Sequence, residues 1–327
     1  MTGHRMDSPP GPEVILDGKQ VLYFAGTSYF SLHSHPEMLQ AASTATLNYG
    51  IGSATSRSMT GTTTLINRLE RTIARFFGSE DAVYLPSGYL SSLAGIRAME
   101  ELDLFDRIYM DEHSHYCNLE AARAIGKPIT LFKHRDPEDL ASSLSGKSAA
   151  GARPLIISDG LFPATGQLAP VGEYVELAEK HRGVVWIDDA HGSGILGVTG
   201  KGTCEHLGVA SPLLYTGTTL SKAFGAYGGA VAGTAAFTGQ IRQGEVMTGS
   251  NSPMNAAVAA SLKGIELVES HPRWREDLWK NARYLRRRLK ESDSYLPVAD
   301  VEDRIPVIAC TTGDSHTMIT VQQRMLE

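Results

Sequence analysis

The sequence predicts an α/β fold built on a mainly parallel sheet with helices on both faces. Short apolar runs separated by helical stretches predict the strands, at residues 82–85, 107–111, 129–133, 154–159, 184–188, 213–217 and 228–233. Uninterrupted apolar runs are typical of strands buried on both faces, and strand–helix alternation is typical of parallel sheets. Polar residues follow several of these runs, at the edge where open α/β sheets bind ligands.

Length and composition set the scale of the fold. The chain has 327 residues, of which 42% are hydrophobic and 20% are charged. These values are typical of a globular protein with one large domain and a smaller one. We expect an N-terminal segment (1–45), a large domain that carries the sheet (46–265) and a small C-terminal α+β domain (266–327).

Charge and cysteine content argue against several classes of protein. The formal net charge of −6 argues against nucleic acid as a partner. No apolar run is long enough to span a membrane. The three cysteines are widely spaced and odd in number, which favours a reduced, cytoplasmic protein.

A hairpin, two helices and a long loop precede the first predicted strand of the sheet. Residues 14–26 have an Asp-Gly turn at their centre, which favours a hairpin. Apolar spacing predicts helices over 35–50 and 65–78, each ending at a glycine. The stretch between them, 50–64, is small, polar and aperiodic, and a loop of that length in a compact domain suggests a functional role.

The segment AVYLPSGYLSS (82–92) predicts a strand, a turn and the start of a helix. Ser87, Gly88 and Tyr89 occupy the turn. Backbone N–H groups at a helix N-terminus have no partner inside the helix, and the helix dipole favours anions there. We therefore expect a phosphate site at this turn.

The segment VVWIDDAHGSG (184–194) predicts a buried strand that ends in charged residues. A carboxylate such as Asp188 can keep a pyridine nitrogen protonated, so that the ring accepts electrons. His191 can reach the phenolic oxygen of the same ring. Helix capping or a metal site are the alternatives for Asp188 and Asp189. No cluster of ligands at metal spacing accompanies them, so we expect no metal.

The segment TGTTLSKAFGAYGG (216–229) places Lys222 among small residues after a predicted strand. Burial of a lysine amine lowers its pKa, and the neutral amine attacks carbonyls. Lysines that bind pyridoxal 5'-phosphate (PLP) as a Schiff base lie in such settings. Alone, the segment favours a Gly-rich turn with a solvated lysine, because Gly-rich loops are common. The order of phosphate turn, Asp188 and Lys222, each after a strand, favours PLP.

These motifs resemble the α-oxoamine synthase group of fold-type-I PLP enzymes, which includes 8-amino-7-oxononanoate synthase, glycine C-acetyltransferase and serine palmitoyltransferase. The resemblance extends over residues 23–312, and its most specific stretches are 50–70, 111–122, 187–202 and 219–229. It implies a fold-type-I transferase in which Lys222 binds PLP, Asp188 faces the pyridine nitrogen and His191 faces the phenolic oxygen.

The resemblance also implies further roles around the cofactor. His115 matches a histidine that stacks on the cofactor ring, and Gly88, Tyr89 and Thr219 match phosphate positions beside Ser87. Residues 247–256 resemble a segment that, in the group, crosses the dimer interface to the partner's phosphate. Asn251 or Ser252 would make that contact, so the resemblance implies a homodimer.

Two departures concern the substrate. Thr27 stands where the group has an asparagine that contacts substrate in several members. The group also continues past the last residue here with a strand region whose arginine binds the substrate carboxylate. We therefore expect the small domain to be incomplete relative to the group, and we take Arg57, in the 50–64 loop, as the candidate for that contact; a solvated surface arginine is the alternative.

The C-terminal part is predicted to be mainly helical. Helical spacing covers residues 255–271 and 273–292, and the basic end of the second helix suits the helix dipole. Residues 305–313 are predicted to form a strand, and a helix starts after residue 314.

The resemblance implies a PLP-dependent acyltransferase. The expected reaction condenses an amino acid with an acyl thioester (acyl-CoA or acyl carrier protein) and releases the carboxylate to give an α-amino ketone. One alternative is another fold-type-I PLP enzyme, an aminotransferase, aldolase or β-lyase. The other is a non-catalytic subunit of a synthase heterodimer, against which the presence of Lys222 argues.

Overall fold

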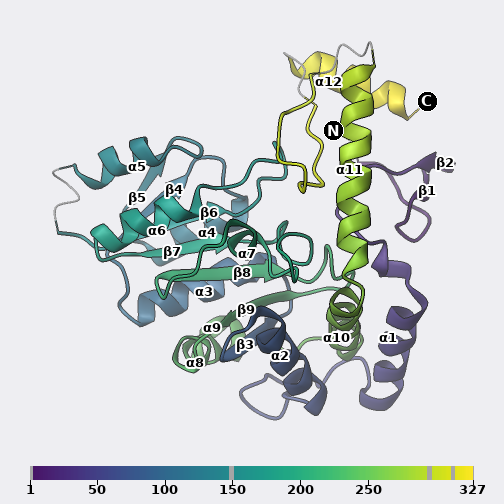
Figure 1. Cartoon of the computed structure of the whole chain (residues 1–327). Helices are drawn as coiled ribbons and strands as arrows, with labels where there is room; N and C mark the ends of the chain where they lie inside the picture. Colours follow the sequence, from purple (N-terminus) through teal and green to yellow (C-terminus); the bar gives the residue numbers. More distant parts are fainter. Residues whose placement is uncertain (1–2, 147–150, 293–296, 311–313, 327) are drawn as a thin grey trace.

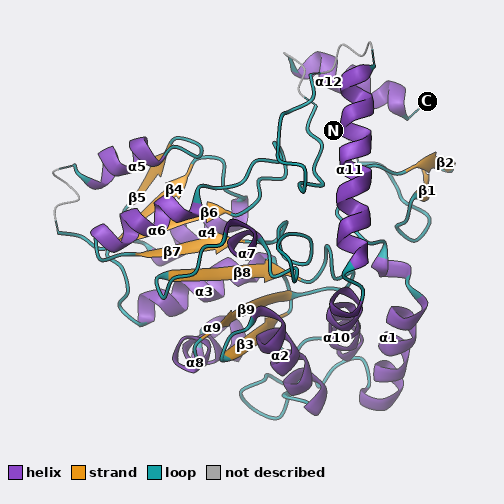
Figure 2. Cartoon of the chain, in the orientation of Figure 1, coloured by secondary structure: helices purple, strands orange, loops and turns teal. Residues whose placement is uncertain are grey.

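The computed structural model describes residues 3–146, 151–292, 297–310 and 314–326. Its centre is a seven-stranded sheet, drawn in orange in Figure 2. The order across the sheet is β3 (Asp81–Leu85), β9 (Gly229–Gly233), β8 (Leu214–Thr219), β7 (Val184–Asp188), β6 (Pro154–Asp159), β4 (Arg107–Asp111) and β5 (Ile129–Phe132). β9 pairs antiparallel with both of its neighbours, and the other pairs are parallel. The predicted α/β class and its mainly parallel sheet are confirmed.

Helices cover both faces of the sheet (Figure 1). Apolar side chains of one face pack against α3 (Tyr89–Glu101), α4 (Tyr116–Ile125) and α8 (Ala235–Gln243). The other face packs against α5 (Pro137–Leu144) and α6 (Val171–Lys180), and, at the β3 edge, against α2 (Thr64–Phe77) and α10 (Asn255–Ser270). The central residues of most strands are apolar because alternate side chains enter cores on opposite faces.

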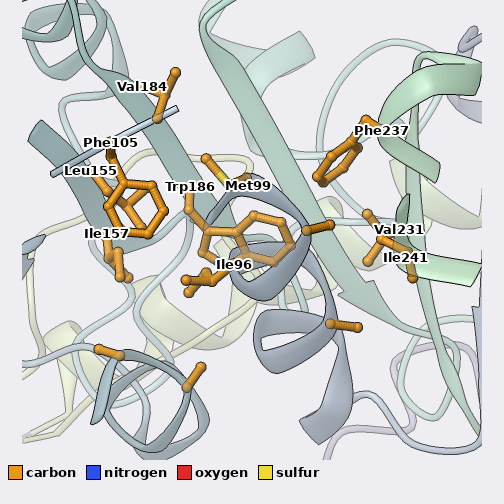
Figure 3. Close-up of a cluster of buried hydrophobic side chains, with 14 of the residues drawn as sticks. Ile96, Met99, Phe105, Leu155, Ile157, Val184, Trp186, Val231, Phe237 and Ile241 are labelled. Atoms are coloured by element: carbon orange, nitrogen blue, oxygen red, sulfur yellow. The ribbon is translucent and has the colours of Figure 1, made fainter. Parts of the chain in front are cut away.

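Trp186 is the largest fully buried side chain and lies at the centre of the first core (Figure 3). Its indole packs against α3 at Gly95. A Cβ at that position would lie 2.2 Å from the ring, which is too close for any side chain. Gly95 thus lets α3 approach β7 closely, and this fixes the start of α3 beside the carboxyl edge of the sheet.

The remaining elements surround this centre. They are the hairpin β1 (Glu13–Leu16) and β2 (Lys19–Leu22), the short helix η1 (Leu32–Ser34), α1 (Pro36–Tyr49), α7 (Thr203–Leu207), α9 (Glu245–Thr248), α11 (Arg273–Glu291) and α12 (Ser315–Met325). Figure 1 shows α11 extending from the region of α10 toward α12. The predicted domain boundary at residue 265 falls inside α10, and the division into domains stays a prediction. In the described part of the chain, no helix is both long and apolar enough to cross a membrane.

One predicted strand is wrong. Among the described residues of 305–313, only Cys310 pairs with another segment, through an isolated bridge to Val298; residues 311–313 lie outside the described part. The Arg286 guanidinium donates to the carbonyl oxygen of Ile305 at 2.6 Å. The Ile305 carbonyl oxygen therefore accepts from a side chain, and not from the backbone amide of a neighbouring strand.

Candidate active site

Lys222 lies in a tight turn immediately after β8. The turn is held by hydrogen bonds from the Leu220 amide to the Gly228 carbonyl and from the Ala226 amide back to the Leu220 carbonyl. Burial lowers the pKa of Lys222, while the nearby carboxyl groups of Asp188 and Asp159 oppose this shift. Burial thus lets the Lys222 amine become neutral and nucleophilic at a lower pH than an exposed lysine.

His191 follows β7 and contacts the lysine directly. Its Nε2 lies 2.7 Å from Lys222 Nζ, and its Nδ1 lies 3.0 Å from the Tyr29 hydroxyl. Burial, reinforced by the charge of Lys222, lowers the pKa of His191 to about 3. The imidazole is therefore neutral and has one donor and one acceptor nitrogen.

Asp188 ends β7, and its carboxylate is fixed on both oxygens. The Ala190 amide donates to Oδ1 at 3.1 Å, and the Cys117 thiol lies 3.2 Å from Oδ2. Asp159 is its cross-strand neighbour on β6. Burial, and then the charge of Asp188, raise the pKa of Asp159 well above its usual range. The Asp159 carboxyl therefore takes up a proton at higher pH than an exposed aspartate does.

His115 caps α4 and is exposed at the edge of the site. Its backbone amide donates to Asp159 Oδ1 at 3.0 Å, and its Nδ1 lies 3.0 Å from Cys117 Sγ. His115, Cys117 and Asp188 thus have potential metal-ligand atoms within 4.8 Å of one another. This corrects the expectation that no such cluster lies near Asp188. The three groups already hydrogen-bond one another, and we propose no ion for them.

The predicted phosphate residues come together between β8 and α3. Gly88 caps α3, and a Cβ there would lie 2.4 Å from Thr219, so only glycine allows this approach. Ser87 Oγ accepts from the Tyr89 amide at 3.2 Å. The Tyr89 ring meets the His115 ring edge-on, with centroids 6.1 Å apart. Thr219 Oγ1 is 2.7 Å from Ser221 Oγ, which places two hydroxyls beside the helix start.

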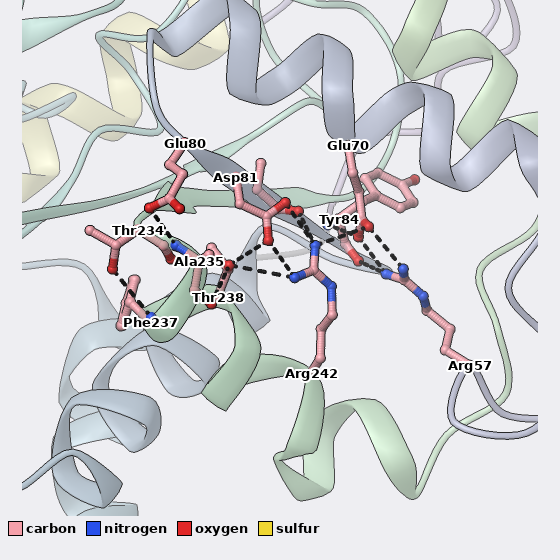
Figure 4. A network of polar contacts seen from close by, with 11 residues as sticks. Arg57, Glu70, Glu80, Asp81, Tyr84, Thr234, Ala235, Phe237, Thr238 and Arg242 are labelled. Atoms are coloured by element: carbon pink, nitrogen blue, oxygen red, sulfur yellow. Dashed lines mark hydrogen bonds and ion pairs between the residues drawn. The ribbon is translucent and has the colours of Figure 1, made fainter.

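Arg57 lies elsewhere and has a different partner. Its guanidinium forms two hydrogen bonds to the buried carboxylate of Glu70, at 2.6 and 3.0 Å, in a network that also includes Asp81 and Arg242 (Figure 4). The Arg57 side chain is only 9% exposed. The Arg57 guanidinium is buried and already paired with Glu70. This geometry argues against a contact between Arg57 and the substrate, and it also argues against a solvated surface arginine.

Two other predicted residues do not contact Lys222 within the described chain. Asn251 is exposed and forms an isolated bridge with Ser56 of the 50–64 loop. Thr27 is half-buried, and its carbonyl accepts from the Tyr29 amide at 3.0 Å. Thr27 thus lies two residues from a side chain that reaches His191.

Sequence reasoning missed three residues that complete the site. Tyr29 reaches His191 from a segment before η1. Cys117 and Asn118 belong to the first turn of α4, and the Asn118 amide bridges toward Asp159 and Asp188, at 3.0 and 3.5 Å. For Cys117 and Asn118, the sequence indicates a place in the site only through their position just after His115. It does not reveal that they face the ends of β6 and β7.

The chain is similar to known proteins along almost all of its length. A family model described as "Aminotransferase class I and II" matches residues 25–327. The 8-amino-7-oxononanoate synthase of Symbiobacterium thermophilum is 35% identical over 323 residues, covering 98% of this chain and 81% of the relative. The same-named protein of Thermosipho melanesiensis is 34% identical over 317 residues, covering 96% and 76%.

Solved structures give the same picture. A serine palmitoyltransferase from Sphingomonas wittichii superimposes with a TM-score of 0.90 and 25% identity, over 99% of this chain and 80% of that one. An 8-amino-7-oxononanoate synthase from Francisella tularensis superimposes with a TM-score of 0.77 and 21% identity, over 93% and 84%. At that identity, the second match supports the fold alone.

Proposed function

Because the chain belongs to the aminotransferase class I and II family, we propose that Lys222 binds PLP covalently at the carboxyl edge of the sheet. The chain is a PLP-dependent acyltransferase of the α-oxoamine synthase group, which condenses an amino acid with an acyl thioester. What we propose beyond this is the role of each residue, the substrates and the assembly.

The residues fit PLP on chemical grounds. The cofactor has an aldehyde, a pyridine nitrogen, a phenolic oxygen and a phosphate, and the site has a group suited to each. Lys222 supplies an amine of lowered pKa, Asp188 a fixed carboxylate and His191 a neutral imidazole. The Gly88–Thr219 approach leaves backbone amides and hydroxyls at a helix start, which suits a phosphate.

We assign the roles accordingly. Asp188 would keep the pyridine nitrogen protonated, His191 would donate to the phenolic oxygen, and the exposed imidazole of His115 would lie against the ring. Ser87, Gly88, Tyr89 and Thr219 would hold the phosphate. When bound, PLP supplies an electron sink for the carbanion formed at the amino-acid α-carbon.

Lys222 has a second task in this reaction. Once an amino acid has replaced it, its neutral Nζ can accept the α-proton, because burial already disfavours the charged amine. The α-carbon then bonds to the acyl carbon, and the thiol leaves. Carbon dioxide leaves as well, the α-carbon takes a proton back, and the thiolate takes one up. Amino acid plus acyl thioester thus gives α-amino ketone, carbon dioxide and free thiol.

For the substrates, the named relatives point to one pair. Their product, 8-amino-7-oxononanoate, carries its amine and its ketone on adjacent carbons. A decarboxylating condensation would build the two carbons at the amine end from alanine, and the rest from a seven-carbon acyl thioester with a terminal carboxylate. We propose alanine and this thioester as the substrates of the chain. Thr27 is a difference from the group here, because it replaces an asparagine that contacts substrate in several members.

We also propose a homodimer and a cytoplasmic location. Apolar side chains are exposed around the 50–64 loop and the Asn251 segment: Leu47, Ile51, Met59 and Met254 are 83%, 69%, 76% and 55% exposed. A second copy that covered them would bury apolar surface and bring Asn251 toward the partner's phosphate site. The three cysteines are free, as a reducing compartment requires.

A thioester assay tests the proposed reaction. The purified protein, supplied with PLP, is incubated with alanine, glycine or serine and with acyl-CoA substrates of different chain length. We expect release of free CoA that requires both substrates and is fastest with alanine and the seven-carbon dicarboxylic thioester. Formation of pyruvate from alanine with a keto acid, without CoA release, would instead indicate an aminotransferase.

A further inference from the structure

A short chain of hydrogen bonds connects Tyr29 to Lys222. The Tyr29 hydroxyl lies 3.0 Å from His191 Nδ1, and His191 Nε2 lies 2.7 Å from Lys222 Nζ. Within the described residues, the Tyr29 hydroxyl has no other hydrogen-bond partner. The two rings are nearly perpendicular, at 86°, so the contact is made by the hydroxyl and not by stacking.

The segment that carries Tyr29 is pressed against the turn of Lys222. Ser28 Oγ is 2.6 Å from His33 Nδ1, and His33 Nε2 is 2.9 Å from the Ser221 carbonyl oxygen. A Cβ on Gly225 would lie 2.3 Å from the Leu32 side chain. The position of the Tyr29 hydroxyl is therefore fixed relative to Lys222.

Both of the linking groups are neutral. Burial raises the pKa of Tyr29 to about 12, and burial lowers the pKa of His191 to about 3. The hydroxyl keeps its proton, and the imidazole carries one proton on one of its two nitrogens. Which nitrogen carries it depends on what each one faces.

In the free chain, a protonated Lys222 has only donors, so Nε2 must accept and the ring proton lies on Nδ1. Tyr29 then accepts from Nδ1. When a phenolic oxygen replaces the ammonium, Nε2 must donate, and Nδ1 needs a donor, which the Tyr29 hydroxyl provides. A neutral hydroxyl can accept from Nδ1–H in the first state and donate to Nδ1 in the second. A carboxylate can only accept, unless it takes up a proton and loses its charge.

We propose that Tyr29 is a positioning residue that lets His191 move its ring proton from Nδ1 to Nε2 when Lys222 takes up PLP. The protons balance: Nε2 takes one from the Lys222 ammonium, Nδ1 gives one to Tyr29, and the original Tyr29 hydroxyl proton leaves to solvent. Lys222 becomes neutral, while His191 and Tyr29 end as they began. The second half of this step rests on the proposed function.

The first test uses the PLP-free chain and needs no activity. Nitrogen-15 labelling of the histidines separates protonated from unprotonated ring nitrogens by NMR, and His191 is identified by the signals lost in His191→Asn. We expect Nδ1–H in the parent chain. In Tyr29→Phe, the buried Nδ1–H has no acceptor, so the Nε2–H form should appear, donating to a Lys222 amine that has released a proton to solvent. An unchanged His191 spectrum in Tyr29→Phe would overturn the proposal.

The second test measures PLP affinity in a double-mutant cycle. We expect Tyr29→Phe to weaken PLP binding about tenfold, because Nδ1 is left without its donor. In a His191→Ala background, the same change should have no further effect. An equal loss in both backgrounds would mean that Tyr29 acts by packing and not through His191.

Tyr215→Phe is the matched control. It removes a half-buried tyrosine hydroxyl at the start of β8, at the opposite end of the strand from Lys222. We expect it to change neither the His191 spectrum nor the PLP affinity. If the parent chain fails to bind PLP at Lys222, the proposed function fails, while the PLP-free spectra still decide the role of Tyr29.

Discussion

Asp188 and Asp189 are neighbours in the sequence with different surroundings. Asp188 lies at the sheet edge against the Ala190 amide and the Cys117 thiol. Asp189 is buried and accepts from the Thr203 hydroxyl at 2.5 Å and from the Thr203 amide at 3.0 Å. Burial raises the pKa of Asp189 to about 7. These surroundings support our proposal that Asp188 serves the cofactor, and Asp189 ties the loop after β7 to α7.

Asn substitutions at the two positions should separate these roles. Asp188→Asn removes the charge that holds a proton on the pyridine nitrogen, so we expect turnover to fall by orders of magnitude with little change in stability. Asp189→Asn should mainly lower the urea midpoint. Steady-state turnover and urea unfolding measure both, and near-normal turnover of Asp188→Asn would contradict the assignment.

The lowered pKa of Lys222 should be visible in the PLP-free chain. A lysine with a depressed pKa reaches its neutral, reactive form at lower pH than an exposed lysine. Competitive acetylation across a pH series, read by peptide mass spectrometry, should give Lys222 a midpoint below that of the exposed Lys19. Asp188→Asn should lower it further, because the Asp188 carboxylate opposes the shift. A Lys222 midpoint equal to that of Lys19 would contradict the burial argument.

The residues whose position could be predicted from the sequence share one property. Asp188 directly ends an apolar strand, and His191 and Lys222 follow such strands by three residues, so the sheet edge locates all three. Tyr29 and Cys117 reach the site through tertiary approaches that no local pattern encodes. Arg57 is a candidate for the substrate because of its place in the 50–64 loop. Its partner, Glu70, lies on an ordinary amphipathic helix, and nothing in the sequence marks that glutamate as buried.

At the scale of elements, the 50–64 loop depends on a buried ion pair. Arg57 in the loop binds Glu70 of α2, which also accepts from the Tyr84 amide of β3 at 2.9 Å. Arg242 of α8 extends the network to Asp81 and lies 3.3 Å from Glu70 (Figure 4). The network therefore joins the loop, a helix on each face of the sheet and the β3 edge.

Arg57→Ala should destabilise the protein without a specific loss of substrate binding. The substitution leaves the buried Glu70 carboxylate without the Arg57 guanidinium. Breaking a buried ion pair in this way lowers the free energy of unfolding by about 3–5 kcal/mol. Arg57→Ala with Glu70→Ala should cost less than Arg57→Ala alone. Urea unfolding of the three chains checks this, and a rise in the Michaelis constant for the amino acid at unchanged stability would restore the substrate role.

The elements that could be predicted are those with their own signals. Apolar runs predicted the strands of the sheet, because β4, β6 and β7 at its centre contribute buried side chains to cores on both faces. The Asp-Gly turn predicted the β1–β2 hairpin, where Asp17 and Gly18 both have positive φ. Residues 305–310 have a similar apolar run but pair only at Cys310. A strand needs a partner, and the sequence of the run does not reveal whether one is available.

For the whole molecule, we expect two copies that share their sites. Asn251 does not reach Lys222 within one chain, and it lies beside a loop with exposed apolar residues. A partner copy would place Asn251 where it can contact the other phosphate site.

Mixing two inactive variants tests this sharing. Lys222→Ala removes the amine, and Asn251→Asp would place a carboxylate near the partner's phosphate, where like charges repel. If sites are shared, one site of each heterodimer carries both lesions and the other carries neither, so mixing should restore activity. The control is each variant alone at the same total concentration. No recovery after verified subunit exchange would mean that each site is self-contained.

The central claim is that Lys222 carries PLP, and one measurement tests it directly. The protein is incubated with PLP, reduced with borohydride to fix the cofactor on its lysine, digested and mapped by mass spectrometry. We expect a yellow protein before reduction, and label on the peptide that contains Lys222. Label on another lysine, or no label with excess PLP, would contradict the claim.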